Sequence, residues 1–173
     1  MATVRIGKLH MSAAVEAIMK AVTVAAVPGV VFVRTKDAAQ TVCDAMTAAG
    51  HNTALVTGDL ALDSRRDAKQ ALMDGSLDWV VATSAWATGV DIPNLASIVN
   101  AAGGKAPIGL KQMAGRGTRL SEGKTAFTLY DLSLGDRRAQ RARQKHYANG
   151  GLTDDIDTQD CFDPLLARLL GEA

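Results

Sequence analysis

Aromatic residues, proline and cysteine are all scarce in this chain. Of its 173 residues, 4% are aromatic, four are prolines and two are cysteines. Cys43 and Cys161 match no metal-ligand spacing, so we expect reduced thiols in the cytoplasm and no metal site. No apolar run reaches the roughly 18 residues of a membrane span, and the first residues lack the apolar core of a signal peptide. These absences favour a globular protein that contacts no membrane.

Charge divides the chain into two unequal parts. The net charge is +1, but residues 1–150 hold 18 basic and 12 acidic side chains, whereas residues 151–173 hold one basic and six acidic. We expect one domain over residues 1–150 and an acidic tail with a short apolar helix over 151–173. Residues 101–150 are the most basic, which indicates either a polyanionic partner or a solvated helix face. The basic helix predicted over 137–147 can equally bind a nucleic-acid strand or pair with the tail.

Short apolar runs alternate with amphipathic segments along the whole body. Strands are predicted over 30–33, 53–56, 79–82, 97–99 and 125–130. Helices are predicted over 12–22 with Ser12 as the N-cap, over 37–49 and 63–73, near 110–114, and over 137–147. Strands that are apolar on both faces and alternate with helices predict an α/β fold, a mostly parallel sheet with helices on both faces.

Ligands of such sheets gather at the carboxyl ends of the strands. The candidate site residues are therefore those that directly follow each strand, in the segments 34–35, 57–59 and 83–93. The lone Trp86 in the last segment can stack on a base, but a tryptophan in a loop more often packs against the body, and we favour packing. Trp79, at the start of a strand, is predicted to lie in the core.

The chain contains no complete loop for binding a triphosphate. Gly123, Lys124 and Thr125 look like the end of such a loop, but Thr118 stands where the motif requires glycine, and Thr125 opens a strand rather than a helix. No strand ends in the paired acidic residues that would hold a magnesium ion. We therefore expect the chain alone to be inactive as an ATPase.

Four segments, in this order, resemble motifs IV, IVa, V and VI of the second RecA-like domain of superfamily 2 helicases. They are VVFVRT at 30–35, TGD at 57–59, ATSAWATGVDIP at 82–93 and QMAGRGTR at 112–119. The resemblance covers about residues 15–135 and implies a RecA-like fold. The stretch 112–131 is most similar to phage-type and repair-type DNA helicases, which implies the cytosol of a bacterium or of a phage-infected host.

The resemblance implies a role for three residues of the last segment. Arg116 and Arg119 lie three residues apart, hence on one face if the segment is helical, and two guanidiniums suit the charge of a transferring phosphoryl group. By resemblance both reach the γ-phosphate, and Gln112 links the nucleotide state to domain closure. The alternative is a surface arginine pair that anchors an acidic helix.

Other residues are assigned to the nucleotide and the strand. The resemblance implies that Gly89 and Asp91 bind the nucleotide, with Asp91 accepting from the ribose hydroxyls, although Asp91 can also be a turn cap before Pro93. It implies contacts to nucleic-acid phosphates, which position a strand without reading its sequence, from Thr57, Gly58 and Thr83. Arg34 and Thr35, at the end of a strand, are further candidates for nucleic-acid contact. Ordinary turn chemistry is a serious alternative for residues 57–59.

These observations predict the C-terminal motor half of an ATP-dependent DNA helicase or translocase, with RNA not excluded as its strand. ATP and Mg²⁺ would be held mainly by an N-terminal motor domain that is absent from this chain. Two alternatives are a stand-alone module that binds nucleic acid without hydrolysing ATP and a protein-interaction module with the same fold.

Overall fold

A parallel five-stranded sheet forms the centre of the protein. The structure is a computed structural model that describes residues 2–87, 91–103, 127–132, 141, 142 and 145. The strands are β1 (Gly29–Val33), β2 (Thr53–Val56), β3 (Trp79–Thr83), β4 (Ser97–Asn100) and β5 (Thr128–Asp131), and the helices are α1 (Ala2–Val24), α2 (Lys36–Ala48), α3 (Leu62–Asp74) and the 3₁₀ helix η1 (Ser84–Ala87). The strand order is β2-β3-β1-β4-β5, and every pair is parallel. The predicted α/β fold is therefore confirmed.

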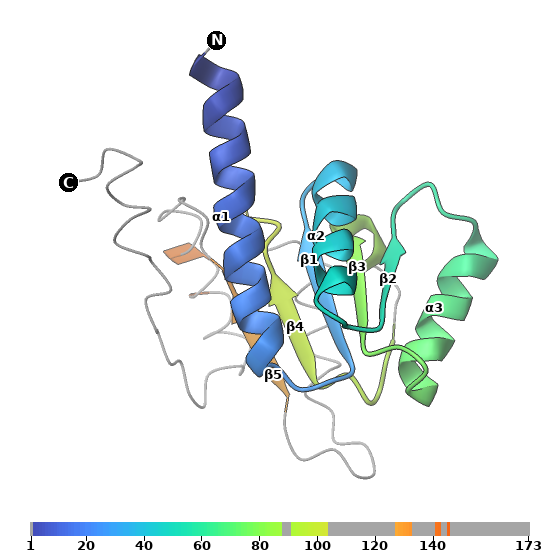
Figure 1. The fold of residues 1–173 in the computed structure, drawn as a ribbon. Coiled ribbons are helices and arrows are strands. Elements are labelled where there is room, and N and C mark those ends of the chain that lie inside the picture. The colour runs from blue at the N-terminus through green and yellow to red at the C-terminus, as the bar shows by residue number, and fades with distance from the viewer. Residues whose placement is uncertain (1, 88–90, 104–126, 133–140, 143–144, 146–173) are drawn as a thin grey trace.

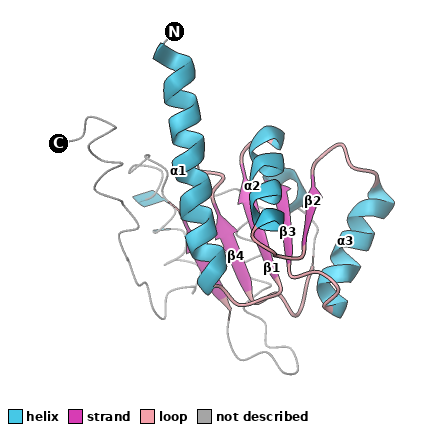
Figure 2. Ribbon diagram, viewed as in Figure 1, coloured by secondary structure: helices cyan, strands magenta, loops and turns pink. Residues whose placement is uncertain are grey.

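The two faces of the sheet bury separate hydrophobic cores because successive side chains of a strand point to opposite sides. Val31 and Val33 of β1 pack with α1 and α2, whereas Val30 and Phe32 pack with α3 and η1. Figure 1 shows α1 and α2 side by side in front of the sheet, and Figure 2 shows α3 on the other side of β2 from α2. Both faces are thus covered, as continuous apolar strands predict.

Local sequence explains where the helices after β1 and β2 begin and end. Thr35 is the N-cap of α2, and its hydroxyl oxygen accepts a hydrogen bond from the backbone N–H of Ala38 at 3.2 Å. Gly50 follows α2 with φ 90° and Gly75 follows α3 with φ 80°, a left-handed conformation that glycine adopts without steric cost. The helix α1 differs from the prediction. It begins well before Ser12, so the predicted N-cap is wrong.

The two tryptophans lie in the cores. Trp79 is completely buried at the start of β3, and Trp86, in η1, is 5% exposed and packs with Leu95 and Ile98. The prediction that both tryptophans pack against the body is confirmed, so Trp86 is not available to stack on a base.

Several predicted elements end differently or lie outside the described residues. The last strand begins at Thr128 rather than at Thr125. The helix predicted near 110–114 lies outside the described residues, and of the basic helix 137–147 the structure describes residues 141, 142 and 145, which are helical.

Among the helices in the described ranges none has the length and apolarity to cross a bilayer, and those ranges hold no cluster of potential metal ligands.

Candidate functional site

The carboxyl ends of β1, β2 and β3 form one edge that carries five of the predicted site residues. Arg34 and Thr35 follow β1, Thr57 and Gly58 follow β2, and Thr83 ends β3. Because β3 lies between β2 and β1, residues far apart in the sequence come together here. The structure thus brings together the predicted strand-binding residues, and we call this part of the protein the carboxyl edge.

At the end of β1, the two predicted residues have different surroundings. The side chain of Arg34 is exposed to solvent. The hydroxyl of Thr35 already takes part in one hydrogen bond, because its oxygen accepts from the backbone N–H of Ala38 at the start of α2. Its hydrogen can still be donated to an incoming acceptor. Both residues therefore retain donors for an anion at the carboxyl edge.

The loop after β2 contains a small polar network. The hydroxyl of Thr57 donates to Oδ1 of Asp59, and the ammonium of Lys36 lies 3.0 Å from Oδ2 of the same carboxylate. The hydrogen bond from Thr57, with the contacts from Lys36 second, lowers the pKa of Asp59 to about 2. The carboxylate is therefore ionised throughout the physiological pH range, and any stability it adds is lost only as the pH falls toward 2.

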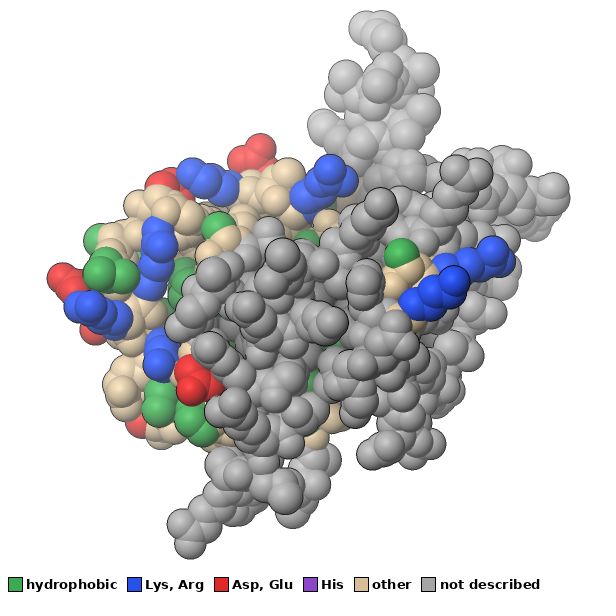
Figure 3. All heavy atoms as spheres, turned by 180° about the vertical axis from the view of Figure 1, so that it is seen from behind, with side chains coloured by type: hydrophobic (Ala, Val, Ile, Leu, Met, Phe, Trp, Pro, Cys, Tyr) green, Lys and Arg blue, Asp and Glu red, His purple; other side chains and the backbone are tan. Residues whose placement is uncertain are grey.

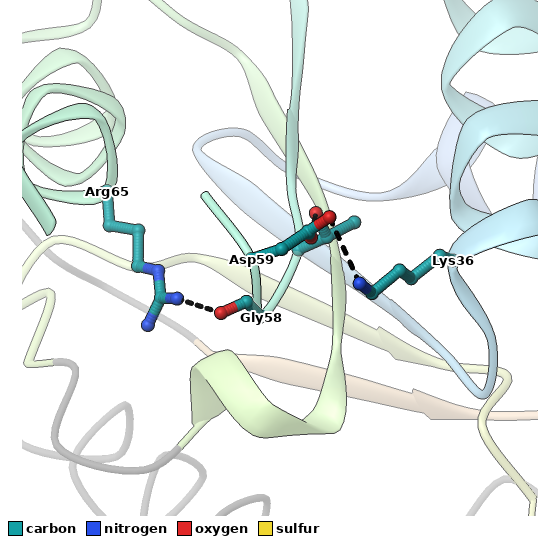
Figure 4. Close-up of polar contacts among 5 residues, drawn as sticks. Lys36, Gly58, Asp59 and Arg65 are labelled. Carbon is teal, nitrogen blue, oxygen red and sulfur yellow. Dashed lines mark hydrogen bonds and ion pairs between the residues drawn. The ribbon is translucent and has the colours of Figure 1, made fainter. Parts of the chain in front are cut away.

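A second basic side chain fixes the same loop from the other side. A guanidinium N–H of Arg65, on α3, donates to the carbonyl oxygen of Gly58. Figure 4 shows Arg65 and Lys36 approaching the loop from opposite sides, one from α3 and the other from the start of α2. Sequence analysis missed both residues. The signal that was available is their position, one directly after Thr35 and the other in the first turn of the helix that follows residues 57–59.

The other predicted site residues differ in accessibility or lie outside the described residues. Thr83 is 9% exposed, so little of its side chain is accessible at the carboxyl edge. Asp91 is exposed, and the next residue, Ile92, anchors it by packing into the core under α3. Gly89, Gln112, Arg116 and Arg119 lie outside the described residues.

Charges of both signs are interspersed on the described surface. Figure 3 shows lysine, arginine, aspartate and glutamate side chains side by side on the part of the rear face that is drawn in colour. Eight of the ten basic residues between 101 and 150 lie outside the described residues, including Lys105, Arg116 and Arg137.

Asn100 organises the other half of the same sheet edge. It is completely buried at the end of β4, and its amide donates to Oδ1 of Asp131, its register partner on β5, at 2.9 Å. The oxygen of the same side-chain amide, Oδ1, accepts from the backbone N–H of Ala102 at 3.3 Å. One side chain thus ties the ends of two strands and the segment that follows β4.

Replacing Asn100 with alanine is expected to lower the free energy of unfolding by about 1–3 kcal/mol, because the buried N–H of Ala102 and the part-buried carboxylate of Asp131 each lose a partner. Urea denaturation followed by circular dichroism measures the loss. The matched control is Gln40→Ala, which removes an amide-to-carboxylate bond of 2.7 Å to Asp44 on the exposed face of α2. The control is expected to change the free energy by less than about 0.5 kcal/mol. Equal losses in the two variants would contradict the role given to Asn100.

The strand order and the helices on both faces define the class of fold. A parallel sheet in the order β2-β3-β1-β4-β5, with helices on both faces and polar loops at the carboxyl edge, is a RecA-like α/β domain. The family model described as "Helicase conserved C-terminal domain" matches residues 13–121. The chain therefore belongs to the helicase C-terminal domain family, as the four motif-like segments predicted.

Two similar proteins with curated descriptions are RNA helicases. The chain is 38% identical over 71 residues to the ATP-dependent RNA helicase DeaD of Klebsiella pneumoniae, and 41% identical over 73 residues to the pre-mRNA-splicing ATP-dependent RNA helicase PRP28 of Yarrowia lipolytica. These regions span 41% and 42% of this chain but only 11% and 13% of the relatives. The predicted similarity to phage-type and repair-type DNA helicases is not supported by these matches.

A solved structure supports the fold independently. The E. coli DEAD-box protein SrmB superposes with a TM-score of 0.67 at 20% identity, over 79% of each chain. At this identity the likeness establishes the fold alone. It agrees with the RecA-like architecture of the described residues.

Proposed function

We propose that this domain is the C-terminal motor half of an ATP-dependent helicase or translocase that grips the backbone of a nucleic-acid strand. The observation that carries the proposal is the match to the helicase C-terminal family over residues 13–121, which includes all the predicted site residues. The position of Arg34, Thr57 and Thr83 at one edge of the sheet supports a shared strand-binding surface. The phosphates of ATP and its Mg²⁺ are assigned mainly to an N-terminal motor domain.

The roles in the ATP site follow from the motifs. Arg116 and Arg119 would stabilise the charge of the transferring phosphoryl group, and Gln112 would couple the nucleotide state to domain closure. Asp91 would accept from the ribose hydroxyls, beside Gly89. The exposed carboxylate of Asp91, held in place by the buried Ile92, is free to accept such hydrogen bonds from a ligand.

We further propose RNA as the strand. The relatives with the matching segments are named RNA helicases, whereas the sequence of residues 112–131 favoured DNA. Contacts to phosphate oxygens exist equally on both polymers, so the carboxyl edge itself does not choose between them. Discrimination requires donors or acceptors that meet the 2′-hydroxyl of RNA.

The test joins this domain to a RecA-like domain that carries a phosphate-binding loop and measures ATP hydrolysis. We expect hydrolysis that is accelerated by single-stranded RNA, a smaller response to DNA of the same sequence, and no hydrolysis by this chain alone. Acceleration by DNA alone would reverse the choice of strand. A two-domain protein that binds ATP but never hydrolyses it would contradict the motor function and favour a non-hydrolysing module.

A further inference from the structure

The carboxylate of Asp59 occupies an arrangement of donors that suits an anion. One of its oxygens accepts from the hydroxyl of Thr57, and the other lies 3.0 Å from the ammonium of Lys36 (Figure 4). A hydroxyl and an ammonium that converge on two oxygens of one acid group offer the same contacts to two oxygens of a phosphodiester. The protein thus supplies its own anion to this pair of donors.

The two donors lie on either side of the central strand of the carboxyl edge. Lys36 follows β1 and Thr57 follows β2, and the end of β3 lies between these two strands. The loop that carries Thr57 is held by the bond from Arg65 to the carbonyl of Gly58 and by the bond from Leu60 N–H to Thr57 O at 3.2 Å. The donors are therefore positioned where the proposed function places the phosphates of the strand.

The bond between Lys36 and Asp59 is easy to exchange. The two side chains are 58% and 63% exposed, and an exposed ion pair contributes little to stability because water solvates both charges well. A phosphate that displaces the carboxylate forms an ion pair with Lys36 in its place. Lys36 is already exposed to solvent, so no other part of the protein has to move first. The carboxylate that is released stays tethered nearby and repels the phosphate, so strand binding is weakened.

We propose that Lys36 and Thr57 bind a phosphate of the nucleic-acid backbone and that Asp59 is the internal competitor for this site. Asp59 thereby sets the affinity of the domain for the strand, and it keeps the two donors paired when no strand is bound. The inference rests on the proposed function, because it assumes that a strand lies along the carboxyl edge.

The experiment measures binding of the full 173-residue chain to a fluorescein-labelled single-stranded RNA by fluorescence anisotropy at several salt concentrations. Asp59→Asn is expected to raise the affinity roughly threefold to fivefold, the range expected when one exposed ion pair no longer competes. The dependence of log affinity on log salt is expected to steepen by about 0.7, because the contact between Lys36 and the phosphate then no longer replaces an internal ion pair and its counterion release is a net gain.

Two further variants separate competition from a general charge effect. Asp63→Asn removes the same charge from an aspartate that is 90% exposed near the start of α3 and paired with Arg66, and we expect a smaller gain from it. Lys36→Gln tests the partner: the gain from Asp59→Asn is expected to be larger with lysine at position 36 than with glutamine. Circular dichroism confirms that each variant is folded.

The outcomes distinguish this inference from the proposed function. If Asp59→Asn and Asp63→Asn give equal gains, or if the gain does not depend on Lys36, the internal competitor is refuted while strand binding stands. Weaker RNA binding by Asp59→Asn also refutes the internal competitor, because the carboxylate would then favour strand binding instead of opposing it. If no variant binds RNA or DNA even at low salt, the strand-binding part of the proposed function fails together with the inference.

Discussion

Replacing Trp79 with alanine is expected to lower the free energy of unfolding by about 3–5 kcal/mol, as for other large aromatic side chains removed from a core. The side chain is completely buried at the start of β3, in the core beneath α1 and α2. Urea denaturation followed by far-UV circular dichroism should show a lower midpoint with an unchanged slope. The control is Leu62→Ala, a residue 61% exposed on α3, for which we expect a change below about 0.5 kcal/mol.

Gly29 provides a second test of how tightly the Trp79 side chain is packed. It is the register partner of Trp79 on β1, and a Cβ at position 29 would lie 2.2 Å from Cζ3 of the indole. Gly29→Ala is therefore expected to cost about 1–3 kcal/mol through overpacking, and clearly less when Trp79 is already alanine. Gly58→Ala is the matched control because its Cβ would meet only Ala85 at 3.8 Å. Equal costs of Gly29→Ala in both backgrounds would show that the indole does not determine the requirement for glycine.

The sequence predicted the strands well because their signals are local. β1, β2, β3 and β4 each contain a short apolar run that is bounded by glycine, proline or polar residues, and each strand was placed to within one residue at either end. The start of α1 was predicted wrongly for a physical reason. A serine marks a helix start only where the preceding chain is not helical, and Ser12 is an exposed residue in the interior of a longer helix.

The candidate site was predicted in part. Residues that directly follow strands meet at one edge in any parallel sheet, so Arg34, Thr57 and Thr83 follow from the alternation of strands and helices alone. The pairing of Lys36 with Asp59 does not, because it depends on β3 lying between β1 and β2. That order is a property of the tertiary structure, and the spacing of 23 residues in the sequence carries no trace of it.

Replacing Arg116 with alanine is expected to slow ATP hydrolysis by the complete two-domain motor at least about a hundredfold. The reason is the role proposed for this guanidinium, which would meet charge that develops on the γ-phosphate only in the transition state. An interaction of that kind lowers the turnover number when it is lost, whereas the affinity for ATP stays nearly unchanged. Steady-state hydrolysis in the presence of RNA gives the turnover number, and titration with a fluorescent ATP analogue gives the affinity.

The control for this prediction is Arg66→Ala, which removes an equal charge from the exposed face of α3, where Arg66 pairs with Asp63. We expect it to leave turnover close to that of the unmodified protein, because that face carries none of the motif residues assigned to ATP. A turnover number that is unchanged by Arg116→Ala would overturn the assignment of the arginine finger. A loss of ATP affinity in proportion to the loss of turnover would instead show that Arg116 binds the ground state, since a residue that acts only in the transition state cannot change both equally.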